Sequence, residues 1–431
     1  MRGSLFIIFF AAATLFATGV ARADVSLPAF YDTVSKMTPE GKLGEVVKRE
    51  EIATTVPGAR AWRFAYVSDD VNGRKTLATA IVAAPDGPVP EGGRPVVSWA
   101  HGTTGTAENC GPSQVPNPAV DLNEYFLIGG NSWTDYGLPS LTAFIKDGYI
   151  VVGTDYQGLG GGGRHQYAIA QTQGRDAINA ARAVASLPDL GAKKQFVVYG
   201  WSQGGGATLA AAGLGDYIAQ TGTAADGLSA LGFVAMAPDD VAVTMPAVTD
   251  EAAAEKALGG LAATFGDNVF NFSHYAMALW GAQAAYPDLN LADPFTDDGA
   301  KALDEILSDK CMHATSDTLT YNYGTNFKSL MRPARANALP WVKALVAGSV
   351  PPVKPAAPVM IFWGTADTVV PPVMGELYRA QMCKLGANVT RIQLPGAQTH
   401  FSTPGASAPY YVPWIEDRFA GKPLPDGCAG A

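Results

Sequence analysis

The most constraining feature of this 431-residue chain is a serine between a strand-like run and a helix-like run. Residues 195–199 are rich in β-branched and aromatic side chains, as in a strand buried inside a parallel sheet, and residues 204–210 are small and begin a helix. Between them, the pattern G-x-S-x-G places Ser202 at a turn that forces a non-glycine residue toward the left-handed conformation. We therefore interpret Ser202 as a nucleophile held at the carboxyl edge of a sheet; the alternative is a simple Gly/Ser-rich turn.

Strand-like and helix-like runs alternate along much of the chain. Residues 62–67 and 77–82 flank an Asn-Gly turn and predict an antiparallel hairpin. The later pattern predicts parallel βα units, so we expect an α/β fold with a mostly parallel, doubly wound sheet. The expected parallel strands and intervening helices cover residues 95–99, 141–146, 149–153, 167–187, 195–199, 230–237, 359–363 and 389–394.

A long stretch of helical composition interrupts this alternation. The 121 residues between Ala237 and Val359 exceed what one crossover helix and its loops require. The clearest helical pieces are residues 251–262 and 300–307. We expect an inserted helical cap over the sheet edge, followed by a stiff proline-rich linker over residues 351–358.

The amino-terminal segment has the pattern of a secretory signal peptide. Arg2 precedes an apolar run over residues 5–20, and a small-x-small cleavage site precedes Asp24. A transmembrane anchor would need roughly 20 apolar residues, and this run has 16. The expected organisation is a signal peptide over residues 1–23, an α/β core formed by residues 24–239 and 351–431, and a helical cap over residues 240–350.

Charge and cysteine content restrict the class of protein. Beyond the signal segment, 28 basic residues oppose 39 acidic ones, a net charge of −11, which argues against nucleic-acid binding and against anionic membrane surfaces. An even number of cysteines in a chain that reaches an oxidising compartment favours two disulfides over four buried thiols, and four cysteines permit three pairings. The four are Cys110, Cys311, Cys383 and Cys428.

A serine nucleophile needs a base, and the base needs an acid to orient it. In a fold with this turn the partners follow in the order serine, acid, histidine. This order excludes His101 and His165. His274 and His313 fall in the expected cap, away from the strand edges, so His400, just after the last strand, is the expected base.

Asp367 is the expected acid because it directly follows the strand that ends at Trp363. Asp239 and Asp240, after the preceding strand, are the alternatives. Asp155 precedes the serine and is interpreted as a turn residue at a strand end.

Acyl transfer also needs donors directed at the developing oxyanion. We expect the backbone N–H groups of Gln203 and Thr103 to supply them. Gly102 would allow the backbone to approach closely, and His101 would brace the loop; the alternative is an ordinary Gly/Thr turn.

These motifs resemble the secretory lipase family of α/β-hydrolases. The resemblance implies the α/β-hydrolase fold and ester hydrolysis by Ser202, Asp367 and His400, with no metal or organic cofactor. Together with the expected architecture, it favours disulfides between Cys110 and Cys311 and between Cys383 and Cys428. The acyl pocket falls outside the matched motifs, which cover residues 99–105, 110–113, 154–160, 200–204, 364–371, 395–400 and 414–421.

The expected function is therefore a secreted lipase or carboxylesterase that forms an acyl-enzyme with a lipid or other ester, with at most transient contact with lipid interfaces. Aromatic residues between Phe265 and Tyr286 favour a triacylglycerol lipase whose cap binds the acyl chain, unless they fill the cap's own core. A serine peptidase of the same fold and a non-catalytic binding protein are the alternatives. A G-x-G-x-x-G pattern at residues 158–163 is rejected as a dinucleotide site, because Asp176 is expected inside a helix.

Overall fold

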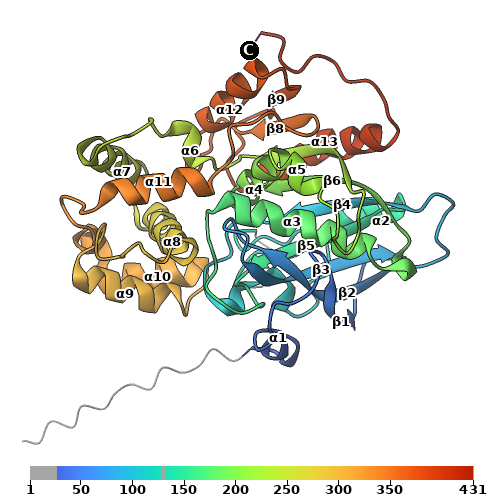
Figure 1. The fold of residues 1–431 in the computed structure, drawn as a ribbon, viewed down its shortest axis with the longest axis horizontal. Coiled ribbons are helices and arrows are strands. Elements are labelled where there is room, and N and C mark those ends of the chain that lie inside the picture. Colours follow the sequence, from blue (N-terminus) through green and yellow to red (C-terminus); the bar gives the residue numbers. More distant parts are fainter. Residues whose placement is uncertain (1–26, 128–129, 131–132, 431) are drawn as a thin grey trace, which may run out of the picture.

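The computed structural model describes residues 27–127, 130 and 133–430, so the expected signal peptide lies outside the described residues. A nine-stranded sheet with the order β1-β2-β3-β5-β4-β6-β7-β8-β9 forms its centre (Figure 1). The pairs from β1 to β5 along this order are antiparallel and the remaining pairs are parallel. The predicted mostly parallel α/β sheet is confirmed.

The strands are β1 Val46–Ile52, β2 Ala59–Asp69, β3 Lys75–Pro85, β4 Arg94–Ala100, β5 Ile150–Gln157, β6 Ala192–Trp201, β7 Ser229–Met236, β8 Val359–Trp363 and β9 Val389–Gln393. The helices outside the long insertion are α1 Ala29–Val34, α2 Leu141–Lys146, α3 Ala170–Ala185, α4 Gln203–Ala212, α5 Gly215–Ile218, α12 Val373–Lys384 and α13 Thr403–Phe419. Short 3₁₀ turns cover Glu108–Cys110, Pro112–Gln114 and Pro188–Leu190.

The edge strand β1 was not predicted from the sequence. Its residues 48–51 are all charged, so no alternation of apolar and polar residues marks it as a strand. It pairs with β2 alone, and charged side chains on an edge strand discourage pairing with other chains.

Both faces of the sheet are covered by helices. Along β6, Phe196 and Val198 pack in one core cluster together with α3 and α4, whereas Val197 and Tyr199 pack in another together with α2 and α13. Successive side chains of a strand point to opposite faces, so a continuous apolar run is what a doubly covered strand requires. This burial fixes the strand ends that carry Ser202, Asp367 and His400.

Six α-helices and a 3₁₀ turn lie between β7 and β8, and we refer to residues 241–348 as the cap. They have a hydrophobic core of their own and lie beside the sheet (Figure 1). The cap consists of α6 Val241–Thr244, α7 Glu251–Phe265, α8 Val269–Ala285, α9 Asp297–Leu307, α10 Met312–Tyr323, η4 Gly324–Leu330 and α11 Ala338–Gly348.

Two disulfides join segments that are distant in sequence. The structure joins Cys110 to Cys311 and Cys383 to Cys428, the pairing that the resemblance favours. The first links the loop after β4 to the start of α10, and the second links α12 to the carboxyl-terminal tail. The cap is therefore covalently attached to the side of the core that carries Thr103.

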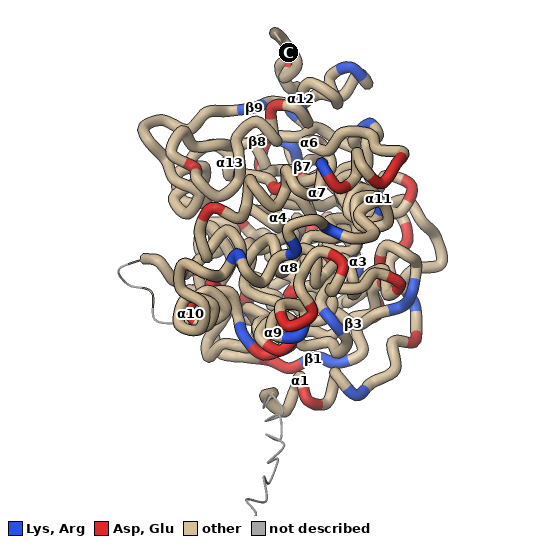
Figure 2. The backbone as a smooth tube through the Cα atoms, turned by 90° about the vertical axis from the view of Figure 1, so that its left-hand side faces the viewer, with Lys and Arg blue, Asp and Glu red and all other residues tan. Residues whose placement is uncertain are grey.

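Charges are mixed on the side that carries α8–α11, where Lys and Arg are interspersed with Asp and Glu (Figure 2). Within the described residues, no helix is both long and apolar enough to cross a membrane.

Candidate active site

Ser202 lies at the sharp turn between β6 and α4, with φ +58° and ψ −121°. A non-glycine residue seldom adopts a positive φ, and such strain persists only where the surroundings impose it. A Cβ on Gly200 would lie 2.2 Å from the carbonyl oxygen of Gly204, and one on Gly204 would lie 1.9 Å from that of Ala100. Both glycines are therefore required, and the turn presents the Ser202 hydroxyl at the carboxyl edge of the sheet.

The structure brings Ser202, His400 and Asp367 into one hydrogen-bonded chain. His400 Nε2 lies 2.8 Å from Ser202 Oγ, and His400 Nδ1 lies 2.8 Å from Asp367 Oδ2. A carboxylate can only accept, so Nδ1–H donates to Asp367 and Nε2 is free to accept from the serine hydroxyl. This tautomer is the one that a histidine base requires.

Further contacts hold the histidine and the acid in place. Asp367 Oδ1 accepts from the backbone N–H groups of Val369 and Val370, at 2.9 Å each. The indole N–H of Trp201 donates to the His400 carbonyl at 3.0 Å. The side chains of His400 and Asp367 are only 3% and 1% exposed, so water competes little for their hydrogen bond.

The two alternative acids occupy other environments. Asp240 accepts from Val243 N–H and Ser349 Oγ and caps α6. Asp239 lines a cavity beside Ser202, but its Oδ1 is buried without a hydrogen-bond partner, and burial raises its pKa to about 6. The carboxyl that bonds to His400 is that of Asp367.

The loop after β4 packs against the turn that carries Ser202. A Cβ on Gly102 would lie 2.6 Å from the Trp201 ring, so only glycine allows this approach. Thr103 lines the same cavity as Ser202 and His400, and its hydroxyl lies 2.7 Å from the Tyr167 hydroxyl. Gln203 is the first residue of α4, so its backbone N–H has no partner within the helix.

His101 and His165 are buried behind the site and bond to backbone carbonyls. His101 Nδ1 lies 2.6 Å from the Gly102 carbonyl, as expected for a residue that braces the loop, and His165 Nδ1 lies 2.6 Å from the Gln157 carbonyl. Burial lowers the pKa of His101 to about 4 and that of His165 to about 3. Both rings are therefore neutral at neutral pH.

The interpretation of Asp155 as a turn residue was wrong. It lies within β5, fully buried, and accepts hydrogen bonds from the Thr79 hydroxyl, the Ser113 N–H and the Ser113 hydroxyl. Burial raises its pKa to about 6. Asp155 thus joins β3 and β5 to the segment that follows Cys110. Asp176, by contrast, lies inside α3 as predicted.

Two small cavities meet at Ser202, and the cap contributes to both. One, of about 30 Å³, is mainly apolar and has Leu261, Phe265 and Leu345 in its wall. The other, of about 10 Å³, includes Thr103 and His400. The site is thus enclosed, with room for little more than one or two water molecules.

His274 and His313 were expected away from the site, and this expectation was wrong. His274 lines both cavities and His313 lines one, because α8 and α10 pack over the strand ends. His274 Nδ1 lies 3.0 Å from the Phe270 carbonyl, so Nδ1–H donates there and Nε2 keeps its lone pair. Burial lowers the pKa of His274 to about 4. His274 therefore presents a neutral acceptor beside the nucleophile.

The aromatic run of the cap divides between two roles. Phe265, Phe270 and Tyr275 line the cavities beside Ser202. Phe272 is fully buried in the cap core, where its ring lies 5.1 Å from that of Phe327. Some aromatic residues of this run thus line the cavities beside Ser202, and others fill the core of the cap.

Sequence comparisons identify the family. The family model described as Secretory lipase matches residues 131–427. Lipase 9 of Candida albicans is 23% identical to this chain, over 98% of this chain and 89% of that protein. A secreted triacylglycerol lipase of Malassezia globosa is 25% identical over 85% of this chain and 74% of its own length.

Comparisons with solved structures agree on the fold. Candida antarctica lipase A in its closed state aligns with a TM-score of 0.66 at 17% identity, covering 90% of this chain and 84% of the lipase. The rice cell wall degrading esterase LipA from Xanthomonas oryzae, in a ligand-bound form, aligns with a TM-score of 0.63 at 16% identity, covering 88% and 98%. The chain belongs to the secretory lipase family of α/β-hydrolases and is a carboxylic ester hydrolase.

Proposed function

We propose that this secreted enzyme hydrolyses carboxylic esters through an acyl-enzyme on Ser202. The observation that carries the proposal is the hydrogen-bonded chain from Ser202 through His400 to Asp367, with the serine held at a positive φ. The Ser202 oxygen attacks the ester carbonyl carbon while His400 Nε2 takes the hydroxyl proton. His400 then returns this proton to the departing alcohol, which leaves the acyl group on Ser202.

Deacylation repeats the same steps with water. His400 Nε2 removes a proton from the attacking water, and the serine oxygen regains a proton as the carboxylic acid leaves. Asp367 holds Nδ1–H throughout and stabilises the imidazolium that forms in each half-reaction.

We assign the oxyanion hole to the backbone N–H groups of Gln203 and Thr103. The Gln203 N–H lies at the amino terminus of α4, where the partial positive charge of the helix favours an anion. The contact between Gly102 and Trp201 supports the position of Thr103 beside Ser202. These backbone dipoles and the protonated His400 stabilise the negative charge that develops on the substrate oxygen.

The substrate that we propose is a triacylglycerol or a similar lipid ester. The wall of the cavity beside Ser202 is mainly apolar and comes largely from the cap, with Leu261, Phe265, Ala278 and Leu345 among its residues. Each methylene transferred from water to such a surface is worth about 0.8 kcal/mol. The relatives named as lipases and secreted triacylglycerol lipases support this assignment.

The test is a series of p-nitrophenyl esters from acetate to palmitate, with emulsified triacylglycerols and p-nitroanilides assayed in parallel. We expect kcat/KM to rise over several added methylenes, triacylglycerols to be cleaved, and anilides to be poor substrates. A steady fall beyond butyrate without triacylglycerol activity would indicate a carboxylesterase. Preference for the anilides would indicate a peptidase.

A further inference from the structure

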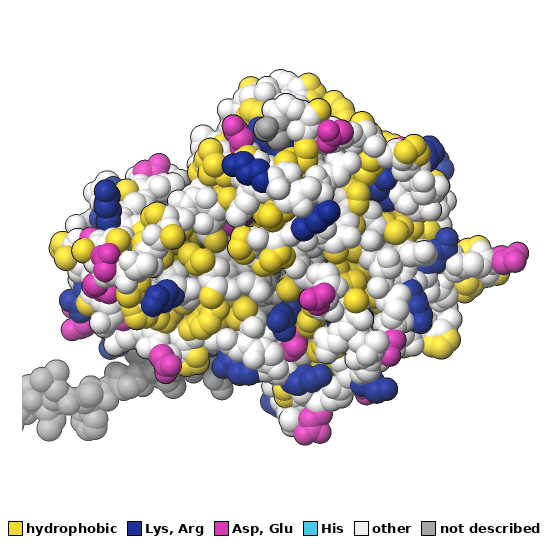
Figure 3. Space-filling model, turned by 45° about the horizontal axis from the view of Figure 1, so that its top comes forward, with side chains coloured by type: hydrophobic (Ala, Val, Ile, Leu, Met, Phe, Trp, Pro, Cys, Tyr) yellow, Lys and Arg dark blue, Asp and Glu magenta, His cyan; other side chains and the backbone are white. Residues whose placement is uncertain are grey.

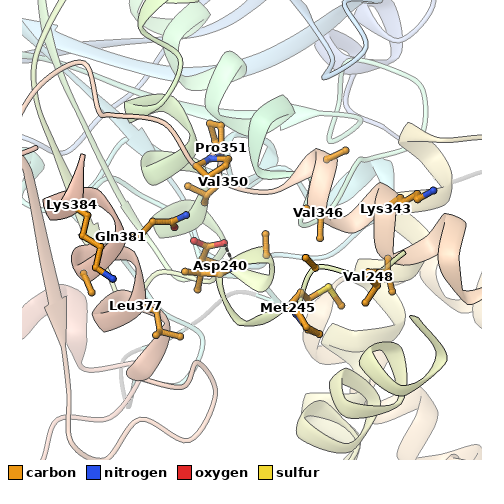
Figure 4. A pocket seen from close by; sticks show the side chains of 18 residues that line it. Asp240, Met245, Val248, Lys343, Val346, Val350, Pro351, Leu377, Gln381 and Lys384 are labelled. Atoms are coloured by element: carbon orange, nitrogen blue, oxygen red, sulfur yellow. Dashed lines mark hydrogen bonds between the residues drawn. The ribbon is translucent and has the colours of Figure 1, made fainter. Parts of the chain in front are cut away.

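A second cavity, of about 780 Å³, lies between the cap and the core (Figure 4). The helices α6 and α11 contribute to this cavity and to the one at Ser202, but the two cavities share no lining residue. Asp239 and Leu345 line the cavity at Ser202, whereas Asp240 and Val346 line the second. Its volume falls in the range of roughly 300–1,000 Å³ that is usual for small-molecule sites. We refer to it as the α11–α12 groove.

The walls of the α11–α12 groove are largely apolar and partly open to solvent. Val346 on α11 is 43% exposed and Leu377 on α12 is 40% exposed. Met245 and Val248 extend the apolar surface on the cap side. Figure 3 shows hydrophobic side chains between the cap and the core on the face that comes forward, with Lys and Arg beside them. Such a surface favours a ligand with a long apolar part.

The charged groups at the groove favour an anionic head. Its lining contains one acid, Asp240, and two lysines, Lys343 and Lys384. Asp240 is only 3% exposed and already accepts from Val243 N–H and Ser349 Oγ. Both lysines are exposed and, within the described part of the chain, neither forms an ion pair. The charge available to a ligand in the groove is therefore positive, in a protein of net charge −9.

Lys384 and Gln381 supply hydrogen-bond donors at one end of the groove. They are three residues apart on α12, so they lie on the same face of the helix, and Figure 4 shows them side by side at the end opposite Lys343. An ammonium group and a side-chain amide can bond to the two oxygens of one carboxylate.

We propose that the α11–α12 groove binds a long-chain fatty acid, with its carboxylate at Lys384 and Gln381 and its alkyl chain between Val346, Leu377 and Met245. The choice of a fatty acid among anionic amphiphiles rests on the proposed function, since ester hydrolysis releases fatty acids; the groove itself does not depend on it. The ligand site is separate from the cavity at Ser202, so the enzyme holds a released acid one helix away from its nucleophile.

The test is calorimetric titration of the full protein with dodecanoate and octanoate below their micellar concentrations, before and after Ser202 is blocked with a hexyl phosphonate. We expect one equivalent of dodecanoate to bind the blocked enzyme. Dodecanoate should bind more tightly than octanoate, by up to about fourfold for each added methylene that becomes buried. Loss of this binding on phosphonylation would place the fatty acid at Ser202 and overturn the proposal.

Matched variants locate the ligand. Lys384→Glu should weaken dodecanoate binding about five- to tenfold, and Lys343→Glu should weaken it less. Lys301 is an exposed lysine on α9, and the control variant Lys301→Glu should leave dodecanoate binding unchanged. Val346→Asp should weaken binding, whereas Val89→Asp, at a residue with nearly the same exposed fraction (44%), should not. Equal binding by Lys384→Glu, Val346→Asp and their controls would refute the site.

The titration also separates this proposal from the proposed function. If Ser202 does not react with the phosphonate and esters are not cleaved, the proposed function fails. Even then, the fatty-acid site would be supported if the unreacted protein bound dodecanoate and the Lys384→Glu variant did not. If neither result were found, the fatty-acid site would be refuted.

Discussion

The edge of the sheet and the cap contribute different chemistry to the same site. Ser202, Asp367 and His400 all follow parallel strands, β6, β8 and β9, and their hydrogen bonds are fixed by the core. The cap adds apolar side chains and the neutral acceptor of His274, all from helices. In the proposed mechanism, bond breaking falls to residues that follow the strands, whereas the surface that contacts the rest of the substrate comes from the insertion.

The largest effects should follow changes on the core side. Ser202→Ala or His400→Ala should lower kcat by about 10⁶, because members of such a triad act as a unit. Steady-state hydrolysis of p-nitrophenyl butyrate measures the loss, and circular dichroism checks that the fold is intact. Residual activity within a hundredfold of wild type would remove that residue from the proposed mechanism.

The two acids near the site offer a sharper comparison within the core. Asp367→Asn should lower kcat by about 10⁴, because the amide no longer holds the required tautomer of His400. Asp239→Asn should change kcat by less than tenfold, since its carboxyl makes no hydrogen bond to His400. If the two variants exchanged these magnitudes, the acid would be Asp239.

The contrast between the sheet edge and the cap also explains which parts of the site could be predicted from the sequence. The order of serine, acid and histidine after successive strands predicted the residues that meet at the sheet edge, because parallel strands end at one edge. The positions of His274 and His313 were missed, because the docking of α8 and α10 over that edge depends on tertiary packing and not on local pattern. For His274, the spacing of four residues from Phe270 places both side chains on one helix face. No such spacing marks His313.

Other failures of prediction have the same physical origin. Asp155 was interpreted as a turn residue because a buried carboxylate is recognisable only from partners such as Thr79 and Ser113, which are remote in sequence. The edge strand β1 carries too many charges for periodicity to reveal it. The aromatic run of α8 was ambiguous, because a helix that packs on two sides lacks a single apolar face.

Two neighbouring phenylalanines of α8 allow a test of which cap residues support the cap's own core and which line the site. Phe272→Ala should lower the free energy of unfolding by about 3–5 kcal/mol, because the ring is fully buried. Phe270→Ala should cost less stability but lower kcat/KM for long-chain esters more than for acetate, because this ring lines the site. Urea denaturation and the ester series measure both. The reverse pattern would show that Phe270 supports the cap and Phe272 the substrate.

Removing the disulfide between cap and core tests whether stability and activity depend on the covalent attachment of the cap. Replacing Cys110 and Cys311 by serine should lower the free energy of unfolding by about 2–5 kcal/mol. It should also reduce activity more than the matched Cys383→Ser/Cys428→Ser pair, because only the first disulfide holds α10 beside the Thr103 loop. Equal activity of the two double variants would show that the geometry of the site does not depend on the disulfide that attaches the cap.

The smallest expected effect concerns the buried histidines behind the site. The pKa of His165 falls from its ordinary value near 6.5 to about 3 in the folded protein, so only the unfolded chain binds its proton between these values. Its contribution to stability is complete above pH 6.5 and is lost as the pH falls. The difference in unfolding free energy between wild type and His165→Gln should therefore shrink by about 2 kcal/mol from pH 7 to pH 5. A difference that is independent of pH would show that the pKa of His165 is the same in the folded and the unfolded chain.

The most direct test of the account is the identity of the residue that carries the acyl group. Peptide mapping by mass spectrometry after reaction with a p-nitrophenyl alkylphosphonate should find one phosphonate per chain, on Ser202. Labelling should be lost in Ser202→Ala and strongly slowed in His400→Ala, because the serine then lacks its base. A label on another residue, or ester hydrolysis that persists without any label on Ser202, would contradict the account.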